Sequence, residues 1–184
     1  MLDVDALVHA RHPGLLVEIE AVIRSLPDGA YIERSVYHHD AARSGLLPLL
    51  DGWRTAGLLH DPVDYRRLPE GDSSFRQIGR RREWKSLSPE DRATLVLIVA
   101  LGDGAVLTCE RLLAKAVREH SLPAVDLFDM MLSGLRTQRL TDEGARKICA
   151  EWDRNPSGAG RPIDYHGSFD AEFAFREAHR PLPF

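Results

Sequence analysis

Residues 88–113 read SPEDRATLVLIVALGDGAVLTCERLL, and they predict a helix, a turn, a short strand and a second helix in that order. Ser88 suits the N-cap position of the first helix, and Pro89 suits its first turn together with the two acids that follow. The apolar run after these acids predicts a buried helix that stops at the glycine-containing turn 102–104. Residues 105–108 are apolar and lie between this turn and the next helix, which predicts a buried strand.

Similar apolar runs, bounded by turn or helix-start residues, recur along the chain and predict further buried strands. They are residues 2–8, 30–33, 105–108 and 124–126, with 58–60 as a weaker fifth. Helical patterns separate these runs, and strands that alternate with helices pair in parallel. The sequence therefore predicts an α/β fold, a three-layer α/β/α sandwich with a central parallel sheet of four to five strands.

The length and composition fit one globular domain. The chain has 184 residues, of which 43% are hydrophobic and 28% are charged. We predict that residues 1–153 form the α/β domain. Residues 154–184 are rich in proline, glycine and aromatic side chains, and are predicted to form an extended arm that docks on this domain or on a partner. Residues 61–87 are expected to form a loop or a helical excursion.

Charge, cysteine content and hydropathy indicate the cellular setting. The 24 basic and 28 acidic side chains give a net charge of −4, so any surface that binds nucleic acid must be local. Cys109 and Cys149 lack metal-ligand spacing, which favours a reducing compartment. No apolar run approaches the roughly 20 residues of a membrane span, and the acids near residue 1 do not suit a signal peptide. The sequence predicts a cytoplasmic protein.

Acids at the ends of the predicted strands are candidate site residues, because ligands of open parallel sheets bind beyond the carboxyl ends of the strands. Asp3 and Asp5 lie two apart in a predicted strand and would share one face, unless this segment is simply solvated. Glu110 follows the strand at 105–108 and Asp91 lies in a first helical turn, where each also suits a helix-dipole or capping role. Carboxylates that converge without histidine or thiolate suit Mg²⁺ or Mn²⁺.

The stretch 91–153 resembles the carboxyl half of PIN-domain nucleases, especially the compact bacterial, VapC-like kind. That family has an acid, an apolar helix, a glycine turn and an apolar strand that ends in Thr-x-Asp. Here the last motif reads Thr108-Cys109-Glu110, longer by one methylene in the acid. Residues 122–127 look like the family's following strand, and residues 141–145 look like the start of its last helix.

The amino half is similar to the same family, more loosely. Residues 2–8 resemble the family's opening Leu-Asp-Thr-Asn-x-Leu-Ile, with Asp5 in place of the asparagine, and residues 32–40 resemble the segment with its second acid. That acid falls at His39, which is not a carboxylate. Asp40 is one residue away, about 100° around a helix. These departures leave a degenerate, inactive domain as an alternative.

The resemblance implies a PIN-like fold and metal-assisted hydrolysis of RNA phosphodiester bonds by an endoribonuclease, as in the toxin of a toxin–antitoxin pair. It implies Mg²⁺ or Mn²⁺ as cofactor, with RNA, a small antitoxin protein and a second copy of the chain as partners. The alternatives are a catalytically inactive PIN-like module that binds RNA or a protein, which His39 favours, and an interaction domain that uses the aromatic arm. The implied catalytic residues are Asp3, Asp91, Thr108 and Glu110, and the implied metal ligands are Asp3, Asp5, Asp40, Asp91 and Glu110.

Residues 75–85 form a basic segment that interleaves arginines with Phe75 and Trp84, whose rings can stack on unpaired bases. The plainer interpretation is a solvated, charged face. The RNA-binding candidates are Arg76, Arg80, Arg81, Arg82, Trp84 and Lys85.

Overall fold

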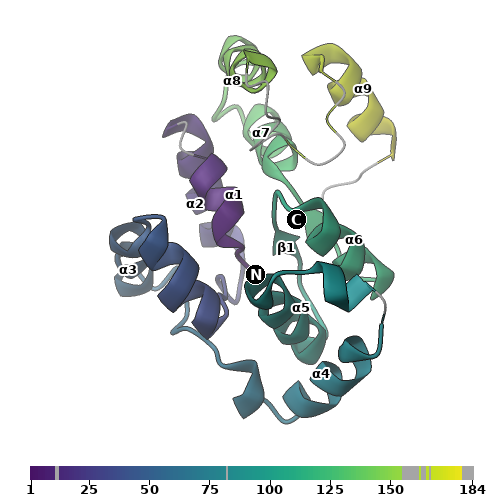
Figure 1. Cartoon of the computed structure of the whole chain (residues 1–184). Helices are drawn as coiled ribbons and strands as arrows, with labels where there is room; N and C mark the ends of the chain where they lie inside the picture. The colour runs from purple at the N-terminus through teal and green to yellow at the C-terminus, as the bar shows by residue number, and fades with distance from the viewer. Residues whose placement is uncertain (11–12, 82, 155–161, 163–164, 166, 180–184) are drawn as a thin grey trace.

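Helices form most of the protein, and the sheet consists of two short parallel strands, β1 (Val106–Leu107) and β2 (Ala124–Val125), in the part of the chain that the structure describes (Figure 1). This structure is a computed structural model that describes residues 1–10, 13–81, 83–154, 162, 165 and 167–179. The expected three-layer α/β/α sandwich with a PIN-like sheet of four to five strands is therefore wrong.

Nine α-helices and three other helical turns occupy the described residues. The turns are the π-helical η1 (Val36–Ala41) and the 3-10 segments η2 (Tyr65–Arg67) and η3 (Glu83–Ser86). The helices are α1 (Val4–His9), α2 (Pro13–Ser25), α3 (Leu47–Thr55), α4 (Gly71–Gly79), α5 (Pro89–Leu101), α6 (Arg111–Glu119), α7 (Leu127–Arg136), α8 (Asp142–Arg154) and α9 (Phe169–His179).

The remaining predicted strands are extended segments that pair through single bridges instead of ladders. The amide of Leu2 donates to the carbonyl of Tyr31 (2.8 Å), and the amide of Asp3 donates to the carbonyl of Leu107 (3.0 Å). Residues 1–3 therefore lie between two extended segments from other parts of the chain. The isolated parallel bridges are Leu2–Leu107, Ala30–Leu59 and Glu33–Val63.

The predicted strand at residues 2–8 is wrong beyond its first residues, because α1 begins at Val4. Asp3 is the N-cap of this helix, and its carboxylate accepts a hydrogen bond from the amide of Asp5 (3.3 Å). Aspartate is among the preferred N-cap residues, and a short apolar run fits a buried helix as well as a buried strand. As a result Asp3 is buried at 6% exposure while Asp5 is exposed, so the two do not share a strand face.

The helix start predicted at Ser88 is confirmed. The Ser88 hydroxyl accepts from the amide of Asp91 (3.0 Å), and the Asp91 carboxylate accepts from the amide of Ser88 (3.2 Å). The helix ends at Gly102, whose φ of 74° is a left-handed conformation that glycine adopts without strain. None of the described helices, this apolar one included, is long and apolar enough to cross a membrane.

Two segments outside the predicted strands are also helical. Residues 61–87 contain α4, η2 and η3, in line with the expected helical excursion. The described part of the arm at 154–184 contains α9, a helix instead of the expected extended chain. The division between residues 153 and 154 stays a prediction.

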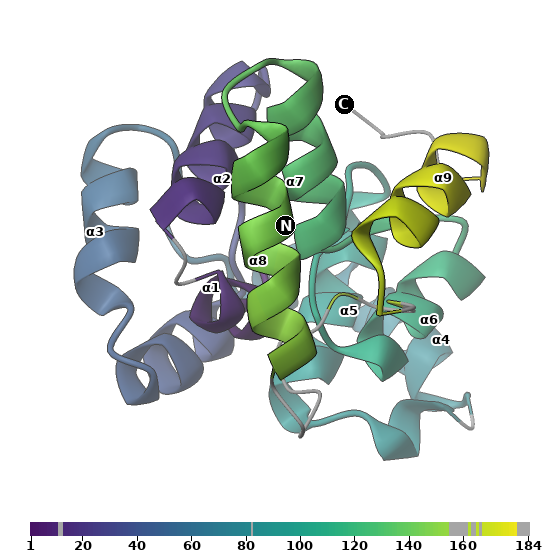
Figure 2. The same cartoon turned by 90° about the horizontal axis from the view of Figure 1, so that it is seen from above.

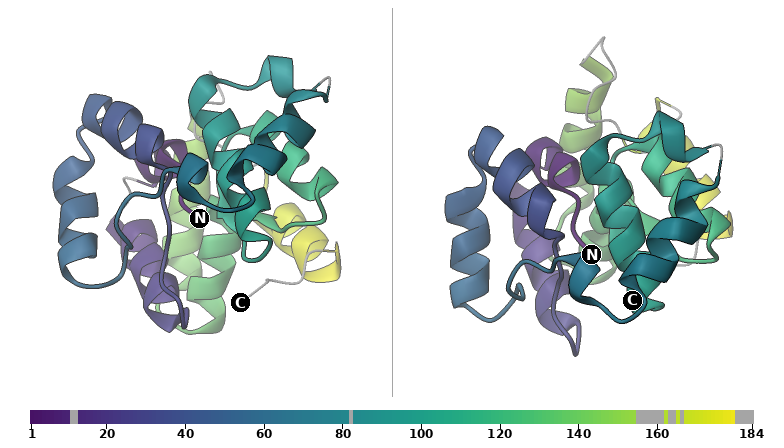
Figure 3. Two further views of the ribbon diagram at one scale, coloured as in Figure 1. Left: turned by 90° about the horizontal axis from the view of Figure 1, so that it is seen from below. Right: turned by 60° about the horizontal axis from the view of Figure 1, so that its bottom comes forward.

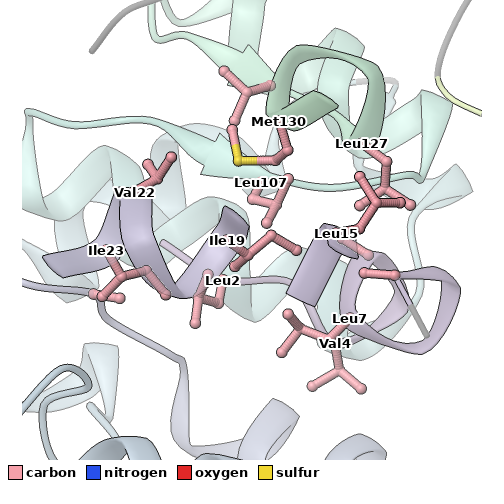
Figure 4. Packing of buried hydrophobic residues seen from close by; sticks show 14 of the residues in the cluster. Leu2, Val4, Leu7, Leu15, Ile19, Val22, Ile23, Leu107, Leu127 and Met130 are labelled. Atoms are coloured by element: carbon pink, nitrogen blue, oxygen red, sulfur yellow. The ribbon is translucent and has the colours of Figure 1, made fainter. Parts of the chain in front are cut away.

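Two groups of buried side chains form the interior. In the larger one, Ile19 of α2 points towards Leu107 of β1 and Met130 of α7 (Figure 4). Figure 2 shows α7 beside α8, with α2 next to them and α9 on the opposite side of α7. The smaller group includes Leu97 of α5 and Leu113 of α6. It lies where α5 packs against α4 and α6, away from α3 (Figure 3). The two short strands lie between these groups and position the acids described next.

Candidate functional site

Asp3 is the most buried of the predicted metal ligands. Burial raises its pKa from 3.8 to about 7, the charges of Asp5 and Asp91 add to this rise, and a hydrogen bond from Thr108 opposes it. The Thr108 hydroxyl donates to Oδ2 of Asp3 (2.5 Å) and accepts from the amide of Glu110 (2.9 Å). The fully buried Thr108 thus connects the N-cap of α1 to the N-cap of α6.

The other predicted acids are linked to Asp3 by their charges: Asp5 and Asp91 act on Asp3, Glu110 acts on Asp91, and Asp5 acts on Asp40. Burial raises the pKa of Asp91, and the charges of Glu110 and Asp5 add to the rise. Glu110 is the N-cap of α6, but its side chain makes no capping hydrogen bond. We call Asp3, Asp5, Asp40, Asp91 and Glu110 the acidic cluster.

Asp40 lies at the edge of this cluster, in η1. Burial raises its pKa, the charges of Glu90 and Asp5 add to the rise, and Arg43 at 3.2 Å opposes it. His39, at the position where the resemblance places the second acid, is exposed and lies 3.7 Å from Glu90. The structure therefore places an imidazole on the surface here, and the neighbouring Asp40 pairs with Arg43.

Within the described residues, the remaining acids of the cluster have no ion-pair partner. Among the described residues, Asp3, Asp5, Asp91 and Glu110 form no ion pair with a lysine, arginine or histidine. Negative charges near a buried carboxyl are costly unless a proton or a cation neutralises them. The raised pKa of Asp3 shows that a proton neutralises this carboxyl near neutral pH, and a bound cation would have the same effect.

The donor atoms of the cluster match a hard divalent cation, but their arrangement is open. All of them are carboxylate oxygens, which Mg²⁺ and Mn²⁺ prefer. Within the ranges that the structure covers, no three histidine, cysteine, aspartate or glutamate side chains lie together as a metal-binding group. The chemistry of the donor atoms fits the expected ion, but in this arrangement the carboxylates do not form one coordination shell.

The described members of the predicted RNA-binding set lie on α4, on η3 and at residues 80–81. Arg80 and Lys85 are exposed, Arg76 donates to the carbonyl of Asp72 (3.2 Å), and Arg81 lies 3.9 Å from Glu119. Arg82 lies outside the described residues. Trp84 is half-buried and lines a pocket.

This pocket, which we call the aromatic pocket, has a volume of about 940 Å³ and lies between η1, η2, α4 and the start of α5. Because Glu90 lines it and precedes Asp91, the pocket borders the acidic cluster. Sequence reasoning missed the pocket, since no local pattern shows that residues 33–39 approach residues 64–84. The lining residues that matter below are Arg34, Tyr65, Arg66, Phe75, Trp84 and Glu90.

Comparison of the chain with models of protein families, with curated proteins and with solved structures finds no match.

A close contact between helices fixes one wall of the aromatic pocket and gives a first prediction. A Cβ atom at Gly71 would lie 1.8 Å from the carbonyl oxygen of Tyr65. Gly71→Ala is therefore expected to push α4 away from η2 and to lower the free energy of unfolding by about 1–3 kcal/mol in urea denaturation. Gly52→Ala in α3 is the matched control, because nothing lies within 4 Å of its added Cβ. Equal losses in both variants would contradict this account.

Proposed function

We propose that the acidic cluster binds a divalent cation and that the protein is a metal-dependent endoribonuclease. The observation that supports this most is that, among the described residues, Asp3, Asp5, Asp91 and Glu110 have no basic ion-pair partner. Their charges nevertheless act on one another: Asp5 and Asp91 raise the pKa of Asp3, and Glu110 and Asp5 raise the pKa of Asp91. A divalent cation removes this repulsion without protonating the acids.

The chain's own residues have separate parts in this proposal. Asp3, Asp91 and Glu110 hold the ion, with Asp5 and Asp40 as auxiliary ligands. Thr108 orients the Asp3 carboxylate through its hydrogen bond. When bound, Mg²⁺ or Mn²⁺ lowers the pKa of a water molecule and stabilises negative charge on a phosphate. Because these carboxylates do not already form a metal site, we expect their side chains to move closer together on binding.

The proposal includes the setting that the resemblance implies. The substrate is RNA, the reaction takes place in the cytoplasm, and a small antitoxin protein and a second copy of this chain are the partners to test. Co-purification with a small co-expressed protein tests the antitoxin. The molecular mass in solution tests the second copy.

A second candidate function is a catalytically inactive module that binds RNA or a protein. The exposed imidazole of His39 favours it, because the cluster lacks a carboxylate at that point. The open spacing of the acids favours it as well.

Titration of the metal-free protein with Mn²⁺ in a calorimeter separates the two functions. We expect saturable binding that Asp3→Asn and Glu110→Gln each weaken by about tenfold or more, together with RNA cleavage that stops when EDTA is added. Asp103→Asn is the control, because Asp103 is an exposed acid in the turn after α5 that bonds the neighbouring Gly104 amide. No binding at millimolar Mn²⁺, or equal affinity in all variants, would rule out the proposed site.

A further inference from the structure

The aromatic pocket has a wall of three rings held in fixed positions. The rings of Tyr65 and Phe75 are parallel with centroids 6.0 Å apart, and Trp84 meets Phe75 edge-on at 5.4 Å. Arg92 holds Trp84 in place, because it donates to the Trp84 carbonyl (2.8 Å) and its guanidinium lies 5.3 Å from the indole ring. Phe75 nevertheless stays 43% exposed, so part of its ring is free to contact a ligand.

Two arginines line the same pocket, together with the acids Glu33, Asp64 and Glu90. A hydrogen bond with the Tyr65 side chain and the charges of Tyr65, Asp64 and Glu33 raise the pKa of Arg66. Arg34 and Arg66 are both exposed, and neither forms an ion pair with an acid in the described part of the chain. The Arg66 guanidinium lies 5.5 Å from the Tyr65 ring, so positive charge lies beside the aromatic wall. Guanidinium groups bind phosphate through paired hydrogen bonds, and aromatic rings stack on nucleobases of any sequence.

The size and position of the pocket suit one nucleotide of a longer strand. Its volume of about 940 Å³ lies within the range of roughly 300–1,000 Å³ that small-molecule sites occupy. Glu90 lines the pocket and also raises the pKa of Asp40 in the acidic cluster. A strand with one nucleotide in the pocket therefore continues next to the acids.

From these observations we infer that the aromatic pocket binds a nucleotide of single-stranded RNA, with the base against Phe75 and Trp84 and a phosphate at Arg34 and Arg66. The choice of RNA rests on the proposed function. The inference extends the proposed function by naming Phe75 and Trp84 as the residues that select an unpaired strand. A base within a duplex has no free ring face to stack on them.

Binding of a fluorescein-labelled, short single-stranded oligoadenylate in EDTA tests this inference without any cleavage. We expect Phe75→Leu to weaken binding by about five- to a hundredfold, as loss of one stacked base does. Phe175→Leu is the matched control, because Phe175 is also 43% exposed but lies on α9. Equal affinity of the two variants would overturn the inference.

The arginines have their own matched pair. Arg66→Gln is expected to weaken binding and to reduce the dependence of affinity on salt by about one phosphate contact. Arg67→Gln is expected to leave both unchanged, because Arg67 is exposed in the same turn but does not line the pocket. If the salt dependence of affinity falls equally in both variants, the arginines act only through the overall positive charge, and the inference fails.

Tryptophan fluorescence gives a direct readout of the pocket. Trp84 is the half-buried tryptophan of the pocket, whereas Trp53 and Trp152 are buried elsewhere. Stacking of a base is expected to quench the wild-type emission, and Trp84→Phe is expected to abolish this quenching. Emission that does not change at saturating oligoadenylate would overturn the inference.

The outcomes for the pocket and for the acidic cluster are distinguishable. Binding in EDTA that depends on Phe75, without cleavage in Mn²⁺, supports the pocket and rejects the nuclease. Cleavage in Mn²⁺ that Phe75→Leu and Arg66→Gln leave unchanged supports the nuclease and rejects the pocket.

Discussion

Replacement of Arg176 by methionine is expected to lower the free energy of unfolding by about 3–5 kcal/mol, the cost of removing one partner from a buried ion pair. Arg176 lies on α9 with no exposed surface and donates to Asp126 (2.6 and 2.9 Å), to Asp129 (2.8 Å) and to Glu172. Its guanidinium also lies 5.0 Å from the Phe128 ring. Methionine keeps much of the volume but leaves three buried carboxylates without this cation.

Urea unfolding at neutral pH measures this loss. Arg146→Met is the control, because Arg146 also binds α9, through Asp170 at 2.8 Å, but does so at the surface. Such an exposed pair is worth about 1 kcal/mol or less. A loss of similar size in both variants would show that the buried arginine has no special role.

The pH dependence provides a second check on the Arg176 cluster. Burial and the neighbouring Asp129 raise the pKa of Asp126 to about 6, although Arg176 opposes the rise. Without the positive charge of Arg176, Asp126 binds a proton more readily. We therefore expect the destabilisation by Arg176→Met to shrink towards about pH 5.

Asp3→Asn is expected to stabilise the metal-free protein at neutral pH. The pKa of Asp3 is about 7 in the folded protein and 3.8 as a reference, so the folded state binds the extra proton between these values. Its contribution to the free energy of unfolding is therefore complete below about pH 4 and is lost as the pH rises through 7. A pKa rise of this size corresponds to at most about 4 kcal/mol.

Unfolding of both proteins between about pH 4 and pH 8, in EDTA, measures the difference. The gain from Asp3→Asn should grow with pH, whereas Asp103→Asn should change stability by no more than about 0.5 kcal/mol at any pH. The opposite slope, or a loss at every pH, would mean that the Asp3 charge supports the fold. A substitution that adds stability and removes metal binding marks a functional residue, because functional groups are often kept at a cost to stability.

The sequence predicted those elements whose signals are local. Ser88, Pro89 and Asp91 specify the start of α5, and Gly102 specifies its end, because capping depends on neighbouring residues only. Glu110 was likewise correctly placed at the start of a helix. In these cases the physical cause lies within a few residues of its effect.

The central sheet could not be predicted because the decisive contacts are tertiary. Residues 2–8 have the apolar content of a strand, but Asp3 begins a helix after the first bridge to Leu107. At 30–33 and 58–60, pairing stops after single bridges. Thr108 nevertheless contacts Asp3, because this hydrogen bond is made by a side chain and needs no long ladder.

Two structural features could not be predicted from the sequence. Arg34 lies among residues expected to lead into the second acid, and only folding brings it to the pocket wall of Tyr65. Arg176 lies in a segment whose prolines and aromatic residues suggested an arm. Its three acidic partners include Asp126, which is 50 positions away, so no local pattern connects them.

The central place of residues 1–3 has a consequence for the order of folding. Leu2 bonds to Tyr31, whereas Asp3 bonds to Leu107 from a much later part of the chain. Contacts over such sequence separations are slow to form, because a long loop must close first. A nascent chain therefore lacks the contacts that β1 and α7 make with α1 and α2 until those later elements have been synthesised.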